Sequence, residues 1–256
     1  MGKTELIFLG TEACIPSPGN DTASYLLNGR ILIDTGWHVT ETLRRAGYVP
    51  SDVQALLFTH MHHDHMMALT AFLYERYCNN SAGKLEIFGP HTMPEAVANA
   101  RRYIGKEIYW PDADEPQLRV LHGGEEAHIC GCSVKTLESV HAVPGLCYRI
   151  DDEETGVSLG FPGDGIALPE FAGFFQGCDV LTHEYSHGAA KNPENSTKHS
   201  SIWDAARTAW QAQVGLLCPV HGKNQKECEE ILKQHYAGVV HWPKPNDRFV
   251  FSAKEK

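Results

Sequence analysis

Four histidines and one aspartate fall within eight residues, Phe58-Thr59-His60-Met61-His62-His63-Asp64-His65. Burying so many polar side chains without partners would cost several kcal/mol, so a packed hydrophobic core does not explain the pattern. Neutral imidazole and carboxylate groups are ligands that zinc and similar divalent ions accept. The apolar run Val53–Phe58 predicts a buried strand before this stretch, and a helix is predicted over His65–Tyr77 after it. The stretch therefore predicts a metal-binding loop between a strand and a helix, with a solvated surface cluster of histidines as the alternative.

The rest of the chain is rich in strand-like runs, with helical segments between them. Asn28-Gly29 lies between two apolar runs and predicts a β-hairpin, because both turn positions need a positive φ. A second hairpin is predicted over Leu146–Phe161, and Ser201-x-x-Asp204 predicts the start of a helix over Ile202–Gln213. No Pro- or Ser-rich linker interrupts the sequence. The pattern predicts a single domain over residues 1–256 in which two sheets pack together with helices outside.

The composition limits the classes of function. The chain is 42% hydrophobic and 21% charged, which is typical of a globular protein with a real core. Its net charge of −10 disfavours a broad nucleic-acid-binding surface, since phosphate contacts need clusters of Lys and Arg. The apolar run at the N-terminus is too short for a signal peptide, and no stretch approaches the roughly 20 apolar residues of a membrane span. Together with eight scattered cysteines, these features predict a cytoplasmic protein with no membrane partner.

The histidine-rich stretch resembles the His-x-His-x-Asp-His signature of the metallo-β-lactamase superfamily. Leu32-Ile-Asp34-Thr-Gly36 resembles the first motif of that family, which implies that Asp34 supports the ligand loop without binding the metal. Three later positions match further family motifs, each after a strand-like run: His141, Asp164 and His221. The resemblance covers nearly the whole chain. It implies an α/β (α+β) fold, the metallo-β-lactamase αββα sandwich of two mixed sheets with helices outside.

The resemblance also implies a dinuclear metal site. The implied ligands of one ion are His60, His62 and His141. The implied ligands of the other ion are Asp64, His65 and His221, and Asp164 would bridge the two ions. Asp64 is counted among the catalytic residues as well. The ions would be divalent, zinc in the first place with manganese or iron as alternatives, and would generate a hydroxide that attacks the substrate.

Within the superfamily, the chain resembles the tRNA 3′-processing endonucleases called ribonuclease Z. Gly10–Gly19 is similar to the opening of that family, and Lys198-His199-Ser-Ser201 is similar to its His-Ser/Thr motif. The resemblance implies that His199 is the general acid that protonates the leaving oxygen, whereas a polar residue at a helix entry is the alternative. Thr182-His183-Glu184 also resembles a family segment, so Glu184 or His183 would orient His199 or complete the metal shell. A homodimer is implied too.

Two features differ from ribonuclease Z. The segment 142–163 is too short to hold both the predicted hairpin and the tRNA-binding arm that the family usually carries there. His221-Gly-Lys223-Asn224 replaces the Phe-Ser and arginine that commonly follow the last ligand. We therefore predict a phosphodiesterase for a small diester or RNA ends that processes precursor tRNA poorly. Lys223 either meets a phosphate oxygen or is a solvated loop residue.

Other functions stay open at this point. The same metals would polarise a carbonyl group, so a hydrolase of lactones, carboxylic esters or thioesters is the main alternative. A metal-binding protein without catalysis is a further class, which the complete ligand set and His199 disfavour. A diiron relative that handles oxygen is disfavoured because His62 stands where such proteins commonly have Glu.

Overall fold

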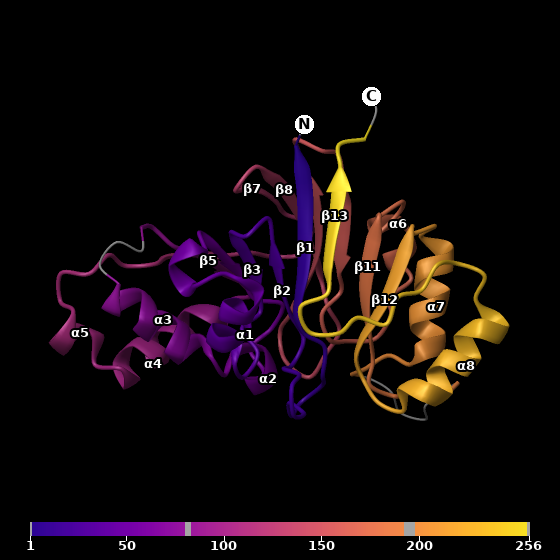
Figure 1. Ribbon diagram of the computed structural model, residues 1–256, viewed down its shortest axis with the longest axis horizontal. Helices are drawn as coiled ribbons and strands as arrows, with labels where there is room; N and C mark the ends of the chain where they lie inside the picture. Colours follow the sequence, from indigo (N-terminus) through magenta and orange to yellow (C-terminus); the bar gives the residue numbers. More distant parts are fainter. Residues whose placement is uncertain (1, 80–82, 192–197, 255–256) are drawn as a thin grey trace. The chain divides into compact units, whose positions relative to one another are not determined.

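The computed structural model describes residues 2–79, 83–191 and 198–254 (Figure 1). The chain forms two compact units. The N-terminal unit consists of Glu5–Leu121 with Lys244–Val250. The C-terminal unit consists of the described residues of 1–4, 122–243 and 251–256. Each unit contains one mixed sheet.

The sheet of the N-terminal unit has the strand order β13-β1-β2-β3-β4-β5-β6. Its strands are β1 (Lys3–Gly10), β2 (Ser24–Leu27), β3 (Ile31–Ile33), β4 (Ala55–Leu57), β5 (Glu86–Gly89), β6 (Gln117–Val120) and β13 (Arg248–Ser252). β1, β2 and β3 pair antiparallel, whereas β3 to β6 pair parallel. Asn28 and Gly29 join β2 to β3 with φ values of 52° and 67°, which confirms the predicted hairpin.

Helices cover one face of this sheet. They are α1 (Val39–Ala46), the 3₁₀ helix η1 (Pro50–Asp52), α2 (His63–Met66), α3 (Leu69–Cys78), α4 (Met93–Tyr103) and α5 (Lys106–Tyr109). Alternate residues of the strands, such as Leu32 and Leu56, share a hydrophobic core with Leu43, Phe72 and Val97 of the helices. Burying such a side chain contributes about 1.5–3 kcal/mol, so this core holds the loop after β4 in place.

The prediction of one helix over His65–Tyr77 is wrong, because the segment forms two helices. The amide of Ala68 donates to the carbonyl of Gly36 at 2.9 Å, and the amide of Thr35 donates to the carbonyl of His65 at 2.8 Å. These backbone groups bond to the loop after β3 instead of continuing the helical ladder. The break therefore ties the histidine-rich loop to the loop that carries Asp34.

The sheet of the C-terminal unit has the strand order β12-β11-β10-β9-β8-β7. Its strands are β7 (Glu126–Ile129), β8 (Cys132–Glu138), β9 (Leu146–Asp152), β10 (Ser158–Phe161), β11 (Val180–Tyr185) and β12 (Leu216–Gly222). β7 to β10 pair antiparallel, and β10, β11 and β12 pair parallel. The second predicted hairpin is confirmed as β9 and β10. Within the fully described segment 142–163, this hairpin is the only regular structure, as expected for a chain without a tRNA-binding arm.

Three helices complete this unit: α6 (Phe171–Phe174), α7 (Ile202–Gln211) and α8 (Gln225–His235). Figure 1 shows α7 and α8, in orange, beside β11 and β12, and Leu181 and Leu217 of these strands share a core with Ile202 and Leu232. Ser201 and Asp204 form the predicted capping box, since each side chain bonds to the other residue's amide. Helix α7 ends at Gln211, two residues before the predicted end.

The expected fold class is confirmed: the chain is an α/β protein with two mixed sheets and helices. In the described part of the chain, no helix combines the length and the apolar character that a membrane crossing requires.

Candidate metal centre

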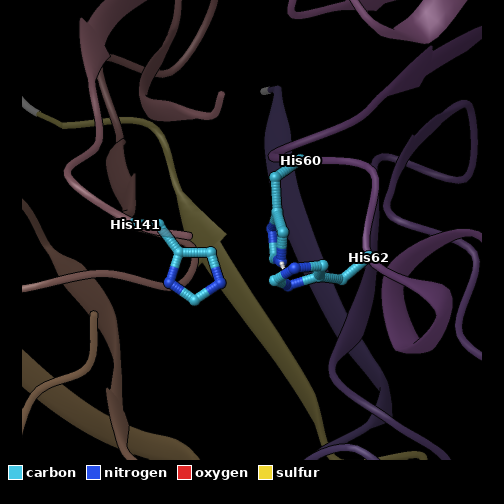
Figure 2. A group of neighbouring side chains, drawn as sticks. All are labelled: His60, His62 and His141. Atoms are coloured by element: carbon cyan, nitrogen blue, oxygen red, sulfur yellow. Dashed lines mark hydrogen bonds between the residues drawn. The ribbon is translucent and has the colours of Figure 1, made fainter. Parts of the chain in front are cut away.

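In the N-terminal unit, the histidine-rich loop begins directly after β4 and leads into α2. Figure 2 shows His60 and His62 from this loop, with Nε2 of His60 and Nδ1 of His62 3.1 Å apart. The ring of His60 is also 4.1 Å from that of His65, measured between centroids. Nε2 of His65 lies 3.6 Å from the carboxylate of Asp64. Four of the sequence-predicted ligands are thus gathered by one short loop, and His60, Asp64 and His65 are buried.

Asp34 lies behind this loop, at the end of the parallel strand β3. Its carboxylate accepts hydrogen bonds from the amide of Thr59 at 2.8 Å, from the Thr59 hydroxyl at 2.7 Å and from Nδ1 of His65 at 2.8 Å. Holding Nδ1 in this way sets the tautomer of His65, so that Nε2 becomes the nitrogen suited to bind a metal. The contacts are those expected of a residue that supports the ligand loop.

The loop after β1 also holds Asp64, a contact that the sequence analysis did not foresee. The amide of Cys14 donates to Oδ2 of Asp64 at 3.0 Å, and the hydroxyl of Thr22 donates to the Asp64 carbonyl at 2.5 Å. A backbone amide leaves no mark on residue type, so the sequence alone carries no signal for the Cys14 contact.

In the C-terminal unit, the candidate ligands come from three separate loops or strand ends. Asp164 follows β10, His221 lies at the end of β12, and His141, drawn in Figure 2, follows β8. Nε2 of His221 lies 3.3 Å from Oδ2 of Asp164. One ligand atom each from His141, Asp164 and His199 lie within 4.8 Å of one another. β10, β11 and β12 run parallel, so their carboxyl ends bring these side chains to the same edge of the sheet.

The histidines of this unit are also oriented through Nδ1. Nδ1 of His141 bonds to the carbonyl of Lys198 at 2.6 Å, and Nδ1 of His221 lies 3.0 Å from the hydroxyl of Ser186. Ser186 was not among the predicted site residues. Both contacts favour Nε2 as the metal-binding nitrogen, as in metalloprotein histidines whose other nitrogen bonds to an oxygen.

The partly exposed His199 and the buried Glu184 form a hydrogen-bonded pair. Nδ1 of His199 lies 3.0 and 3.2 Å from the two carboxylate oxygens of Glu184, and 3.9 Å from Asp164. The hydrogen bond to Glu184 raises the pKa of His199, although burial by itself would lower it. Burial by itself would raise the pKa of Glu184, but the hydrogen bond from His199 and the nearby His221 keep that pKa below its usual value. The pair therefore favours a protonated imidazole beside a carboxylate.

Backbone amides hold the Glu184 carboxylate from two sides. The amides of Gly165 and Ser186 donate to the Glu184 carboxylate at 2.8 and 3.2 Å. His183 is buried and donates through Nδ1 to the Glu184 carbonyl at 2.8 Å, so it contacts the backbone of Glu184 and not its carboxylate. Burial lowers the pKa of His183, which favours its neutral form. Lys223 lies on an exposed loop.

The donor set fits divalent metal ions. Two buried carboxylates, Asp64 and Asp164, lie beside histidine nitrogens, and burying such charges is costly without a compensating cation. Imidazoles oriented through Nδ1, together with carboxylate oxygens, are ligands that zinc, manganese and iron accept. The described residues can therefore hold metal ions of this class.

Comparisons with known proteins agree with this chemistry. The model of the Beta-lactamase superfamily domain matches residues 29–222. Ribonuclease BN of Enterobacter sp. (strain 638) is 27% identical, in a match that covers 90% of this chain and 93% of the relative. Ribonuclease Z of Methanocaldococcus jannaschii is 24% identical, with coverages of 92% and 90%.

A solved structure shares the fold over the full length. The metallo-beta-lactamase fold protein YhfI from Bacillus subtilis superposes with a TM-score of 0.82 at 20% identity, covering 98% of this chain and 100% of that one. The expected metallo-β-lactamase fold and the resemblance to ribonuclease Z are thus confirmed. Because the family model matches more than half of the sequence, the chain belongs to the beta-lactamase superfamily.

Proposed function

We propose that this protein is a dinuclear metal-dependent phosphodiesterase. The observation that carries the proposal is the His199–Glu184 pair, in which Nδ1 of His199 bonds to the Glu184 carboxylate and lies 3.9 Å from Oδ2 of the candidate ligand Asp164. A proton donor next to a metal ligand can act as the general acid that a poor leaving group such as an alkoxide requires. The relatives that are named ribonucleases support a phosphodiester as the bond that is cleaved.

We further propose that the two units form one domain and jointly hold two ions, zinc in the first place, with manganese or iron as alternatives. The proposed ligands are His60, His62, Asp64, His65, His141, Asp164 and His221. Two arguments support this set: the donor geometry within each unit, and the family motifs that these residues match. When bound, divalent ions supply an activated water and neutralise charge on the phosphoryl oxygens.

The chain's own residues then orient groups and deliver the proton. Glu184 fixes the ring of His199 through Nδ1, so the proton on Nε2 is the one donated to the leaving oxygen. Two amides fix Glu184, which keeps the acid in a single orientation. Asp34 has the corresponding role for His65. The pKa of His199 is raised, so this acid keeps its proton to higher pH than an ordinary histidine.

The proposed substrate is a small phosphodiester or an RNA end, and precursor tRNA should be processed poorly. The β9–β10 hairpin fills the segment 142–163, and the chain has 22 basic against 32 acidic residues. Both features disfavour a large polyanionic partner. A homodimer is part of the proposal on the ground of family resemblance, and a cytoplasmic location on the ground of the eight scattered cysteines.

The test uses one metal-loaded sample on three substrates. We expect turnover of bis(p-nitrophenyl) phosphate, slow opening of lactones, and little cleavage of a 3′-extended tRNA. Rapid lactone opening without any diester cleavage would favour the carboxylic ester alternative. Efficient tRNA cleavage at one position would show that another surface replaces the missing arm.

A further inference from the structure

A groove of about 450 Å³ opens beside the histidine-rich loop of the N-terminal unit. Its lining includes Met61, Met66, Thr92, Glu95, Asn99 and Tyr103. We propose that this groove binds the nucleobase of a nucleotide phosphodiester. The inference rests on the proposed function, because it assigns a substrate group to the same site.

The place of the groove connects it to the metal centre. Met61 stands between His60 and His62, two of the proposed ligands, and Met66 ends α2, which the same loop leads into. The groove is therefore lined in part by the same loop that carries these two histidines. The volume lies in the range of small-molecule sites, so it suits one nucleoside.

The apolar part of the lining suits a flat aromatic ring. Met61 and Met66 are partly buried and pack against the hydrophobic core of the unit, which fixes their positions. Methionine sulfur makes favourable contacts with aromatic rings. Tyr103, at the end of α4, is 85% exposed and offers a ring on which a base can stack.

The polar part of the lining suits the hydrogen-bonding edge of a base. Glu95 offers an acceptor, and Asn99 already accepts from Arg102 at 3.2 Å, so its amide N–H groups are the ones left to donate. The Thr92 hydroxyl is buried and has no hydrogen-bond partner among the described residues, although Thr92 directly precedes α4. A purely hydrocarbon group could not use these hydrogen-bonding atoms, whereas the edge of a base can.

The charge of the lining disfavours a nucleic-acid backbone in the groove. None of the described residues that line it is Lys or Arg, and Glu95 is acidic. Phosphate contacts dominate the binding of nucleic-acid backbones and need such cations. The occupant is therefore an uncharged base and not a run of phosphates.

The first test observes the groove without catalysis. Methionine methyl groups labelled with ¹³C give one signal for each of the five methionines, and Met61 and Met66 are assigned with M61L and M66L. On titration of the zinc-loaded protein with adenosine, which contains no phosphodiester, these two signals should shift with a dissociation constant in the millimolar range. The signals of Met67 and of the fully buried Met93, which do not line the groove, should stay in place.

The second test compares two diesters that share one leaving group, adenosine 5′-(4-nitrophenyl) phosphate and methyl 4-nitrophenyl phosphate. Base stacking is worth about 1–3 kcal/mol by alanine substitution, so Y103A should raise the KM for the adenosine diester about 5- to 150-fold. The kcat for both diesters and the KM for the methyl diester should stay unchanged. Y109A is the matched control, because Tyr109 is 70% exposed and lines a different cavity.

The outcomes separate the two proposals. Methionine shifts without diesterase activity would retain the nucleobase site and overturn the proposed phosphodiesterase. Diester turnover with no shift of Met61 and Met66, or with equal KM changes for both diesters in Y103A, would overturn the nucleobase site alone.

Discussion

The two units contribute candidate ligands in opposite ways. The N-terminal unit supplies four from one loop of six residues, His60 to His65, and braces that loop with the carboxylate of Asp34. The C-terminal unit supplies His141, Asp164 and His221 from strand ends far apart in sequence. In this unit a serine hydroxyl and a backbone carbonyl hold Nδ1 of the ligand histidines.

The difference shows which unit carries which part of the proposed chemistry. The contiguous loop presents ligands alone, and its supporting carboxylate reaches a histidine that would bind metal. The C-terminal unit adds the His199–Glu184 pair, in which a similar carboxylate contact raises the pKa of the imidazole. One pattern, a carboxylate on Nδ1, would thus make a metal ligand in one unit and a proton donor in the other.

The largest expected effect comes from removing the proposed bridge between the ions. Wild-type protein purified without chelator should hold about two transition-metal ions per chain. Asp164→Ala should lose at least one ion and lower diester turnover by about 10⁴-fold or more, because a whole dinuclear centre is disrupted. Elemental analysis with steady-state kinetics measures both, and the exposed Asp114→Ala is the control. A variant that keeps two ions would remove Asp164 from the ligand set.

His199→Ala should have the next largest effect. We expect turnover to fall by about 10²–10⁴-fold while the metal content stays intact, because the residue delivers a proton and binds no ion. The loss should shrink for diesters with acidic leaving groups, which depart without protonation. His199 also lies within 4.8 Å of His141 and Asp164 ligand atoms, so loss of metal in this variant would make it a ligand instead.

The candidate ligands of the two units also differ in how much of them could be predicted from the sequence alone. The contiguous loop could be read directly, since its spacing is local and its chemistry excludes a core. Asp164 and His221 could be assigned only through family motifs, because nothing local distinguishes an aspartate after one strand from any turn residue. The break between α2 and α3 and the Cys14 amide contact could not be predicted. Both arise from backbone bonds between distant segments, which side-chain patterns do not encode.

The hairpins and the capping box of α7 were predictable because local sequence alone specifies them. Asn28-Gly29 and Ser201-x-x-Asp204 satisfy their own backbone requirements within a few residues, so distant contacts are not needed to specify them. The position of Ser186 against His221 depends instead on the pairing of β11 with β12.

Removing the group that holds Nδ1 of a ligand histidine should lower metal affinity by different amounts in the two units. Asp34→Asn replaces a carboxylate that holds His65, and we expect metal affinity to fall about 10- to 100-fold. Ser186→Ala removes a neutral hydroxyl from His221 and should cost less. Competition with a chromogenic chelator measures both affinities. An equal loss in the two variants would show that charge on the brace is unimportant.

The smallest effect is expected for Glu184→Gln, and it concerns pH more than rate. The hydrogen bond to the Glu184 carboxylate is the main cause of the raised pKa of His199. Glutamine keeps the size and an acceptor oxygen but removes the charge that stabilises the imidazolium, so the pKa of His199 should fall. An acid must be protonated to act, and activity is lost as the pH rises through its pKa. The alkaline limb of the pH–rate profile should therefore move to lower pH, while the rate well below that limb changes little. Rates measured over the pH range decide it, with the exposed Glu170→Gln as the matched control. An unmoved alkaline limb would mean that the carboxylate positions the ring of His199 without setting its proton affinity.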